Sequence, residues 1–217
     1  LVGEDGPTHH GAFDVGFLRV VPNIVLMAPK DGEELGTMLE AAVAWGKPVA
    51  IRYPKGEAEP IEGILGGFKS APVELGKSEL VLAGSGPLIL AYGSMVAPSL
   101  RAALRLREAG IEASVVNARF AKPLDSSPLL EAACAGRPIV VVEEGALAGG
   151  VGSAVLEALE GAGLFRPGLV RRLGLPDAFV THGSREELLQ MCGLTPDGIV
   201  KAVGDLAANY WAEGVRR

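Results

Sequence analysis

The chain has 217 residues, of which 48% are hydrophobic, 5% aromatic and 21% charged. This composition lies outside the low-hydrophobicity, high-charge range of disordered chains, and the length allows one large domain or two small ones. The net charge of −6, without any basic run, excludes the dense positive surface that binds nucleic acid. No uninterrupted apolar stretch reaches the roughly 18 residues that would predict a membrane span.

The cysteines and the first residues bear on the cellular setting. Cys134 and Cys192 lie far apart without metal-ligand spacing, so we expect two small buried residues in a reducing compartment. The chain begins at Leu1 with neither an initiator methionine nor the pattern of a signal peptide. We expect a fragment that starts within a domain and belongs to the bacterial cytoplasm. A plastid location stays open, because a transit peptide would precede Leu1.

The first part of the chain predicts a short α/β unit. Residues 12–21 are expected to be helical, and the apolar run 24–28 predicts a buried strand. Asp31 and Glu34 have the spacing of a capping box, and apolar residues follow at helical intervals. A second strand is predicted over residues 48–53.

The rest of the chain predicts a linker and a second α/β unit. Residues 57–78 are rich in glycine and proline, which indicates a crossing between domains. The apolar runs 80–83 and 88–92 are separated by a short turn and predict two antiparallel strands. Beyond them, strands alternate with helices, which favours a mainly parallel sheet with right-handed crossovers. Strands are expected over 112–117, 138–142 and 169–173, and helices over 98–109, 126–135, 150–161, 185–192 and 196–211.

A glycine-rich loop is the first candidate site. Residues 3–11 contain Asp5, His9 and His10 among three glycines. Imidazole changes its charge near neutral pH and therefore suits proton transfer, while glycine lets the backbone approach a ligand closely. A surface turn with incidental histidines is the alternative. A metal site is disfavoured, because adjacent histidines rarely aim both rings at one ion.

The second candidate site follows the predicted strand 48–53. Arg52, Tyr53 and Lys55 come at its carboxyl end, where ligands collect in open α/β sheets. Arg52 offers a planar fork for phosphate or carboxylate, and Lys55 adds a point charge. A surface ion pair is the alternative.

Two further motifs leave alternatives open. The loop 143–152 could cradle a phosphate at a helix start, but it lacks the G-x-G-x-x-G spacing and carries two glutamates, so a packing loop is favoured. Arg119 and Lys122 follow a predicted strand and could bind an anion or form salt links between domains. His182 precedes a predicted helix and is interpreted as structural.

Taken in order, these motifs resemble the transketolase superfamily of thiamine-diphosphate enzymes. Within it they match the pattern of the 1-deoxy-D-xylulose-5-phosphate synthases, since transketolases proper usually differ after Arg52. The resemblance covers essentially the whole chain. The matching motifs are residues 5–14, 52–56, 117–125, 143–145, 149–155 and 175–180.

The resemblance implies an α/β chain in two parts. Residues 1–70 would be the end of the pyrimidine-binding, central transketolase domain with its linker, and residues 71–217 the transketolase C-terminal domain with a mostly parallel sheet. Thiamine diphosphate and Mg²⁺ are the implied cofactors, with their main ligands upstream of Leu1 in a missing N-terminal part of the same enzyme. The implied assembly is a homodimer. The C-terminal domain receives no catalytic residue and is interpreted as a packing and dimer-supporting unit.

The implied reaction joins pyruvate and glyceraldehyde 3-phosphate into 1-deoxy-D-xylulose 5-phosphate with loss of CO₂, the first step of non-mevalonate isoprenoid synthesis. His9 is implied as the proton-transferring, cofactor-facing residue, and Asp5 as the acid near the acceptor's hydroxyl. Arg52 would bind the acceptor's phosphate, with His10 and Tyr53 as further substrate-binding residues. The isolated chain is expected to be inactive. The alternatives are a transketolase-type ketol transferase and a non-catalytic subunit or assembly module.

Overall fold

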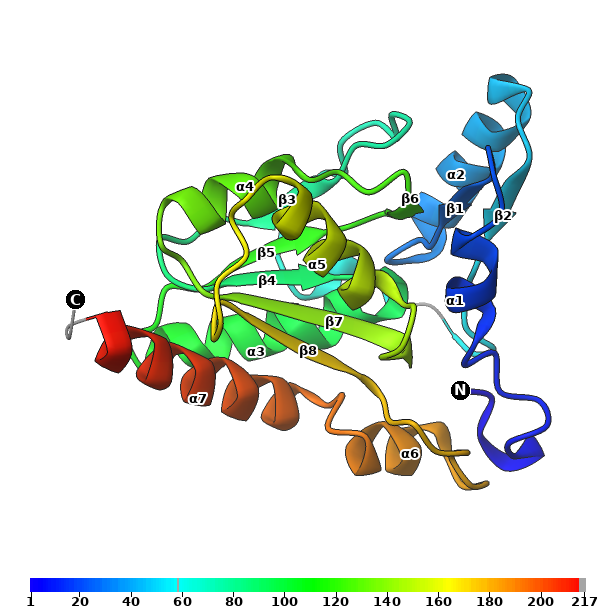
Figure 1. The fold of residues 1–217 in the computed structure, drawn as a ribbon. Coiled ribbons are helices and arrows are strands. Elements are labelled where there is room, and N and C mark those ends of the chain that lie inside the picture. Colours follow the sequence, from blue (N-terminus) through cyan, green and yellow to red (C-terminus); the bar gives the residue numbers. More distant parts are fainter. Residues whose placement is uncertain (58, 215–217) are drawn as a thin grey trace.

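The computed structural model describes residues 1–57 and 59–214, and it confirms the predicted α/β architecture (Figure 1). The strands are β1 (Val25–Met27), β2 (Val49–Ile51), β3 (Glu79–Leu82), β4 (Leu88–Ala91), β5 (Ser114–Asn117), β6 (Phe120–Lys122), β7 (Ile139–Ala146) and β8 (Val170–Leu175). The α-helices are α1 (Asp14–Arg19), α2 (Gly32–Trp45), α3 (Val96–Glu108), α4 (Ser127–Cys134), α5 (Val151–Gly161), α6 (Arg185–Met191) and α7 (Pro196–Gly214). Short 3₁₀ turns are η1 (Gly3–Asp5), η2 (Ile61–Gly63) and η3 (Gly93–Met95).

The larger sheet has five strands in the order β3-β5-β4-β7-β8, all parallel except β3. The runs 80–83 and 88–92 form antiparallel strands as predicted, but they do not pair with each other, because β5 lies between β3 and β4 and pairs with both. All four residues of β5 are buried, and a buried strand needs a hydrogen-bonding partner on each side. The connecting loop crosses over the start of β5, where a Cβ at Gly84 would lie 2.4 Å from the carbonyl oxygen of Glu112.

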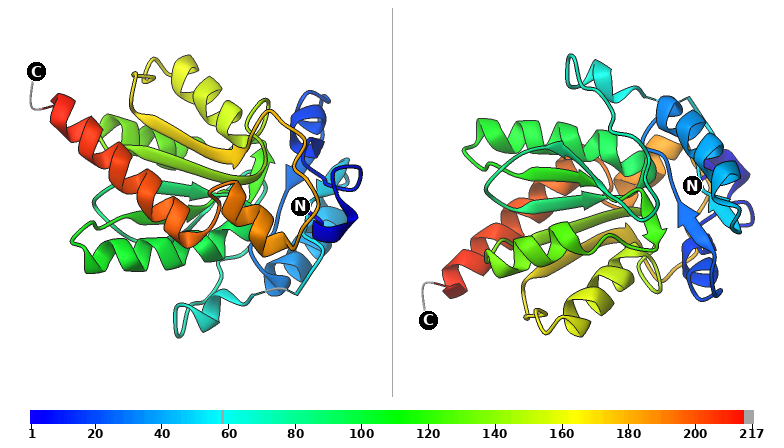
Figure 2. Two further views of the ribbon diagram at one scale, coloured as in Figure 1. Left: turned by 90° about the horizontal axis from the view of Figure 1, so that it is seen from below. Right: turned by 90° about the horizontal axis from the view of Figure 1, so that it is seen from above.

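Helices cover both faces of this sheet, α3 and α7 on one and α4 and α5 on the other (Figures 1 and 2). Side chains along β4 alternate between the two layers, as the pleat of a strand requires. Ile89 and Ala91 belong to the core beneath α3 and α7, whereas Leu88 and Leu90 belong to the core beneath α4 and α5. The four-residue strand is therefore buried on both sides, as expected for a parallel sheet.

The smaller sheet joins the first part of the chain to the middle of the sequence, with the order β2-β1-β6. β1 and β2 are parallel, and β6 adds an antiparallel edge to β1. The chain leaves β5 and turns at Arg119, whose φ of 55° lies in the left-handed region. Phe120 then packs with Met27 and Met38 in a separate small core. β6 was not predicted, since the motif 117–125 was interpreted only as a cationic stretch just beyond a strand.

The small sheet and the residues before it pack against the carboxyl ends of β4 and β7 (Figure 1). The Ala146 amide at the end of β7 donates to the carbonyl oxygen of Ala12, at 2.8 Å. In this position the glycine-rich loop, which precedes α1, reaches the edge of the sheet where ligands collect in α/β folds.

Two further expectations can be compared with the described residues. The prediction that both cysteines are buried is wrong: Cys134 is exposed and Cys192 is half-buried. Cys134 is the last residue of α4, whose buried face is formed by Leu129, Ala132 and Ala133. Among the described helices, none combines the length and the apolar character needed to cross a membrane.

Candidate active site

Residues 3–11, here called the histidine loop, have an inner and an outer face. Gly3 and Gly6 turn the chain with φ values of 79° and 74°, which glycine adopts without steric penalty. Both glycines are buried, whereas Asp5 and His9 are exposed. The predicted catalytic residues therefore lie on the outer face of a loop whose glycines form the inner face.

The two adjacent histidines have different surroundings. His9 is exposed, and its Nδ1 lies 3.0 Å from the hydroxyl of Thr8. The Nδ1 atom of His10 accepts a hydrogen bond from the Val2 amide at 3.1 Å. The proton of His10 is therefore assigned to Nε2, which donates to the carbonyl oxygen of Thr181 at 3.2 Å. Both ring nitrogens of His10 are occupied by main-chain partners.

The fold brings the first two candidate sites together through Asp5 and Lys55. The Lys55 ammonium lies 2.8 Å from the Asp5 carboxylate, and both side chains are exposed. The hydrogen bond from Lys55, followed by its positive charge, lowers the pKa of Asp5. The same contact raises the pKa of Lys55. Neither side chain is enclosed by protein, so a ligand can compete for both.

Arg52 lies one layer deeper and makes only internal contacts. Its Nε donates to the Asp14 carboxylate at 2.8 Å, and its Nη2 donates to the carbonyl oxygens of Gly11 and Glu144 at 3.2 and 2.5 Å. Only 17% of its side-chain surface is exposed. Arg52 thus ties the end of the histidine loop to β7, and Lys55 is the cation of this strand end that faces solvent.

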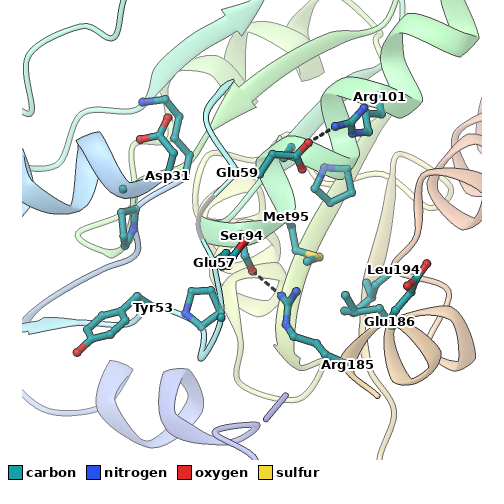
Figure 3. Close-up of a pocket in the computed structure, with 18 of the residues that line it drawn as sticks. Asp31, Tyr53, Glu57, Glu59, Ser94, Met95, Arg101, Arg185, Glu186 and Leu194 are labelled. Carbon is teal, nitrogen blue, oxygen red and sulfur yellow. Dashed lines mark hydrogen bonds and ion pairs between the residues drawn. The ribbon is translucent and has the colours of Figure 1, made fainter. Parts of the chain in front are cut away.

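A cavity of about 560 Å³ opens between the small sheet and the C-terminal part of the chain (Figure 3). Tyr53 lines its rim and is 63% exposed. Arg185 and Ser94 meet on one wall, and Arg101 pairs with Glu59 on another (Figure 3). Asp5, His9, His10 and Arg52 do not line this cavity.

Arg119 and Lys122 form links between the two parts of the chain, which decides between the alternatives left open for this motif. Arg119 is buried, and its Nε donates to Glu34 of α2 at 2.7 Å. It also contacts Glu79 of β3 at 3.2 Å, and Lys30 lies 3.1 and 3.0 Å from these same two glutamates. We call Lys30, Glu34, Glu79 and Arg119 the buried charge cluster; its two cations balance its two anions.

The ammonium of Lys122 also acts within the protein. It donates to the carbonyl oxygens of Arg19 and Val21 at 2.8 and 2.6 Å, which join the end of α1 to β6. These partners leave the motif with the role of an internal connection instead of an anion site.

The glycine loop 143–152 packs closely and carries its own anion. The Glu143 carboxylate accepts hydrogen bonds from the Val151 and Gly152 amides at 2.7 and 2.8 Å, so it occupies the N-terminus of α5. A Cβ at Gly150 would lie 2.3 Å from this carboxylate. Burial of Glu143 raises its pKa, although the two amides act in the opposite direction. The preference for a packing loop over a phosphate loop is confirmed.

The family of the chain follows from comparison with known proteins. The family model "Transketolase, C-terminal domain" matches residues 76–199, and "Transketolase, pyrimidine binding domain" matches residues 1–60. This chain belongs to the transketolase family. The resemblance seen in its motifs is therefore confirmed.

Curated relatives are named 1-deoxy-D-xylulose-5-phosphate synthase. One from Gloeobacter violaceus is 50% identical over 204 residues, which are 94% of this chain and 31% of that protein. One from Synechococcus sp. is 43% identical over 217 residues, which are 100% of this chain and 33% of that protein. The chain spans about a third of the length of these relatives.

Solved structures confirm the fold. A structure described as "Split gene transketolase, inactive beta4 tetramer" matches with a TM-score of 0.80 at 29% identity, over 93% of this chain and 63% of that one. A transketolase from Pichia stipitis matches with a TM-score of 0.71 at 21% identity, over 97% of this chain and 29% of that one.

Sequence reasoning missed the segment that the C-terminal domain places against the histidine loop. Residues 179–185, here called the anchor segment, contain the acceptor for His10 and the arginine that pairs with Glu144. The motif 175–180 and His182 drew attention to part of this segment but not to its contact with the loop. A further local signal was the spacing of Ser184 and Glu187, which form a capping box at the start of α6.

Proposed function

We propose that this chain is part of a thiamine-diphosphate-dependent synthase that joins pyruvate and glyceraldehyde 3-phosphate into 1-deoxy-D-xylulose 5-phosphate, with release of CO₂. The identity of 43–50% to synthases of that name, across at least 92% of this chain, carries the proposal. The proposal includes a homodimer, a bacterial cytoplasmic location, a domain division near residue 70 and inactivity of the chain alone.

The residues present fit one end of such a cofactor site. When bound, thiamine diphosphate supplies a thiazolium ring that stabilises the carbanion left by decarboxylation. The exposed imidazole of His9, next to Asp5 and Lys55, is a donor set for proton transfer and for polar substrate groups. Among the side chains that the structure describes, in residues 1–57 and 59–210, no three of His, Cys, Asp or Glu are grouped so as to hold a metal ion. We therefore assign Mg²⁺ and the diphosphate to residues outside this chain.

The exposed residues of the two candidate sites then have roles in the proposed reaction. His9 exchanges a proton with the oxygen of the reacting carbonyl, a task suited to imidazole at neutral pH. Asp5 accepts a hydrogen bond from the acceptor's hydroxyl. Lys55 offers the acceptor's phosphate an exposed positive charge, and binding this phosphate would replace its contact with Asp5. Tyr53, exposed on the rim of the cavity, remains a candidate for substrate contact.

We propose Lys55, which faces solvent, for the phosphate-binding role that the sequence motif implied for Arg52. Arg52 would have to give up Asp14 and two carbonyl oxygens before it could bind a substrate. A hydrogen bond to a charged group contributes about 1.5–3 kcal/mol, so this exchange would return little net affinity. We propose that Arg52 holds the histidine loop against β7.

Release of labelled CO₂ from [1-¹⁴C]pyruvate tests the reaction, using the full-length protein that contains this chain. We expect release that depends on glyceraldehyde 3-phosphate and on thiamine diphosphate. Ketol transfer between sugars without CO₂ from pyruvate would favour the transketolase-type alternative. The description of one neighbour as an inactive β4 tetramer of a split-gene transketolase supports the assembly-module alternative. Activity that appears only after a separate partner chain is added would favour this alternative.

The variants Lys55→Met and Arg52→Met separate the two cations. We expect Lys55→Met to raise the KM for glyceraldehyde 3-phosphate about 10- to 100-fold with little change in the KM for pyruvate, since it loses a charge-assisted contact. Arg52→Met should lower kcat and stability without this selectivity. A selective rise in the acceptor KM for Arg52→Met alone would return the phosphate to Arg52.

A further inference from the structure

We propose that the C-terminal domain holds the histidine loop in its working position, and that His10 is the positioning residue through which the anchor segment 179–185 acts. This inference deepens the proposed function, because the loop carries the catalytic His9 and Asp5. It gives the C-terminal domain a part in catalysis that the packing and dimer-supporting role expected from sequence does not include.

The single ring of His10 connects the start of the chain, at Val2, to the anchor segment, at Thr181. Its Nδ1 accepts from the Val2 amide, before the loop, and its Nε2 donates to the Thr181 carbonyl oxygen, in the anchor segment. The bridge therefore needs a side chain with an acceptor and a donor about one ring width apart. Because His10 directly follows His9 in the chain, a displacement of the His10 ring also displaces the catalytic imidazole.

The glycines of the loop complete the inner face. A Cβ at Gly3 would lie 3.2 Å from the carbonyl oxygen of Gly183 and 3.4 Å from the amide of Arg185. A Cβ at Gly6 would lie 3.4 Å from the Cβ of His182. The backbone of the loop is thus seated directly on the anchor segment, with no intervening side chain from the loop at these two points.

The anchor segment is itself held by the C-terminal domain. Gly183 rests on the buried side chain of Leu188, and Ser184 caps α6 through reciprocal hydrogen bonds with Glu187. The Arg185 guanidinium pairs with the Glu144 carboxylate at the end of β7. Figure 1 shows the result, with the loop at the start of the chain lying beside α6.

An aromatic contact extends the same interface. The rings of Phe13, just after the loop, and Phe179 meet edge to face with centroids 6.1 Å apart. Contacts on the inner face thus come from glycine backbone, His10 and Phe13, while Asp5 and His9 are exposed on the outer face and do not contact the anchor segment. This separation is what a positioned catalytic loop requires, since the groups that hold it are not the groups that react.

Hydrogen exchange of the full-length protein that contains this chain tests the bridge without any cofactor or substrate. We expect amides of residues 2–11 to exchange about tenfold faster in His10→Ala. The variant lacks both hydrogen bonds of the His10 ring, so the loop opens at a lower cost in free energy. His10→Gln should stay near the wild-type rate, since its amide offers both an acceptor oxygen and N–H donors. Thr181→Ala is the matched control, because it keeps the accepting carbonyl. Exchange in His10→Ala within about twofold of wild type would overturn the proposal.

The tautomer of His10 gives a second readout that needs no variant. Long-range ¹H–¹⁵N spectra should show an unprotonated Nδ1 and a protonated Nε2 for His10 at neutral pH. A protonated Nδ1 would break the bond from Val2 and overturn the proposal even where His10→Ala fails to fold.

Kinetics of the full-length protein distinguish positioning from substrate binding. We expect His10→Ala to lower kcat about tenfold or more with both KM values changed by less than about twofold, and His10→Gln to restore kcat. A rise in the acceptor KM with unchanged kcat, and unchanged exchange of the loop, would assign His10 to substrate and overturn the positioning role. Absence of synthase activity in the wild type would refute the proposed function alone, because the exchange and tautomer results do not depend on it.

Discussion

Removal of Arg119 should destabilise the chain more than removal of any surface arginine. In Arg119→Met, Glu34 and Glu79 keep only Lys30 as a buried cation, so the buried charge cluster changes from neutral to a net charge of −1. Loss of one partner from a buried ion pair costs about 3–5 kcal/mol, because the remaining charge stays desolvated.

The other contacts of the Arg119 side chain do not add to this loss of stability. Arg119 also donates to the carbonyl oxygens of Pro72 and Ala71 at 2.9 and 2.7 Å. Both of these residues are exposed, so water can replace the guanidinium at their oxygens. We therefore expect the free energy of unfolding to fall by about 3–5 kcal/mol.

Urea denaturation followed by circular dichroism measures this change. Arg105→Met is the matched control, because Arg105 pairs with Asp197 on the surface and is half exposed, and such pairs contribute about 0–1 kcal/mol. The double variant Arg119→Met/Glu79→Gln restores charge balance and should recover at least about 1 kcal/mol. A loss below about 1 kcal/mol for Arg119→Met, equal to that of the control, would refute the argument.

Two further predictions concern packing and pH. Gly150→Ala should destabilise the chain by about 1–3 kcal/mol, because the added Cβ overlaps the Glu143 carboxylate, whereas Gly204→Ala, in open space within α7, should stabilise it by about 0.5–1 kcal/mol; equal melting temperatures would contradict both. Burial acts to raise the pKa of Asp125, but hydrogen bonds led by that from Ser78 outweigh it and lower this pKa. The stability that Asp125 adds relative to Asp125→Asn should therefore be complete above its ordinary pKa of 3.8 and shrink as the pH falls below it; a difference that grows in acid would contradict this sign.

The structure assigns the C-terminal part of the chain more than a supporting role. It contributes β6 to the small sheet, Arg119 to the buried charge cluster and the anchor segment to the histidine loop. Each of these contacts crosses between the regions matched by the two family models. The position of the histidine loop therefore depends on both regions.

Local sequence patterns were sufficient for most elements of the fold. The apolar run 24–28 and the helical spacing after Asp31 correspond to β1 and α2, and Asp31 accepts the predicted hydrogen bond from the Glu34 amide at 2.9 Å. Such signals depend on periodicity and on capping within a few residues, so they can be read from the sequence whatever tertiary contacts the element makes. The motifs also identified the family, because the order of short motifs can be read from the sequence without knowledge of their tertiary contacts.

Tertiary structure decided which residues each of these elements meets. The Glu34 carboxylate, expected to close the capping box on Asp31, instead accepts from the Lys30 amide at 2.7 Å and pairs with Arg119 from 85 residues away. The insertion of β5 between β3 and β4, and the seat of His10 on Thr181, likewise join segments distant in sequence. The periodicity of the sequence does not predict such long-range contacts, because a buried polar group pairs with whichever partner the topology places beside it.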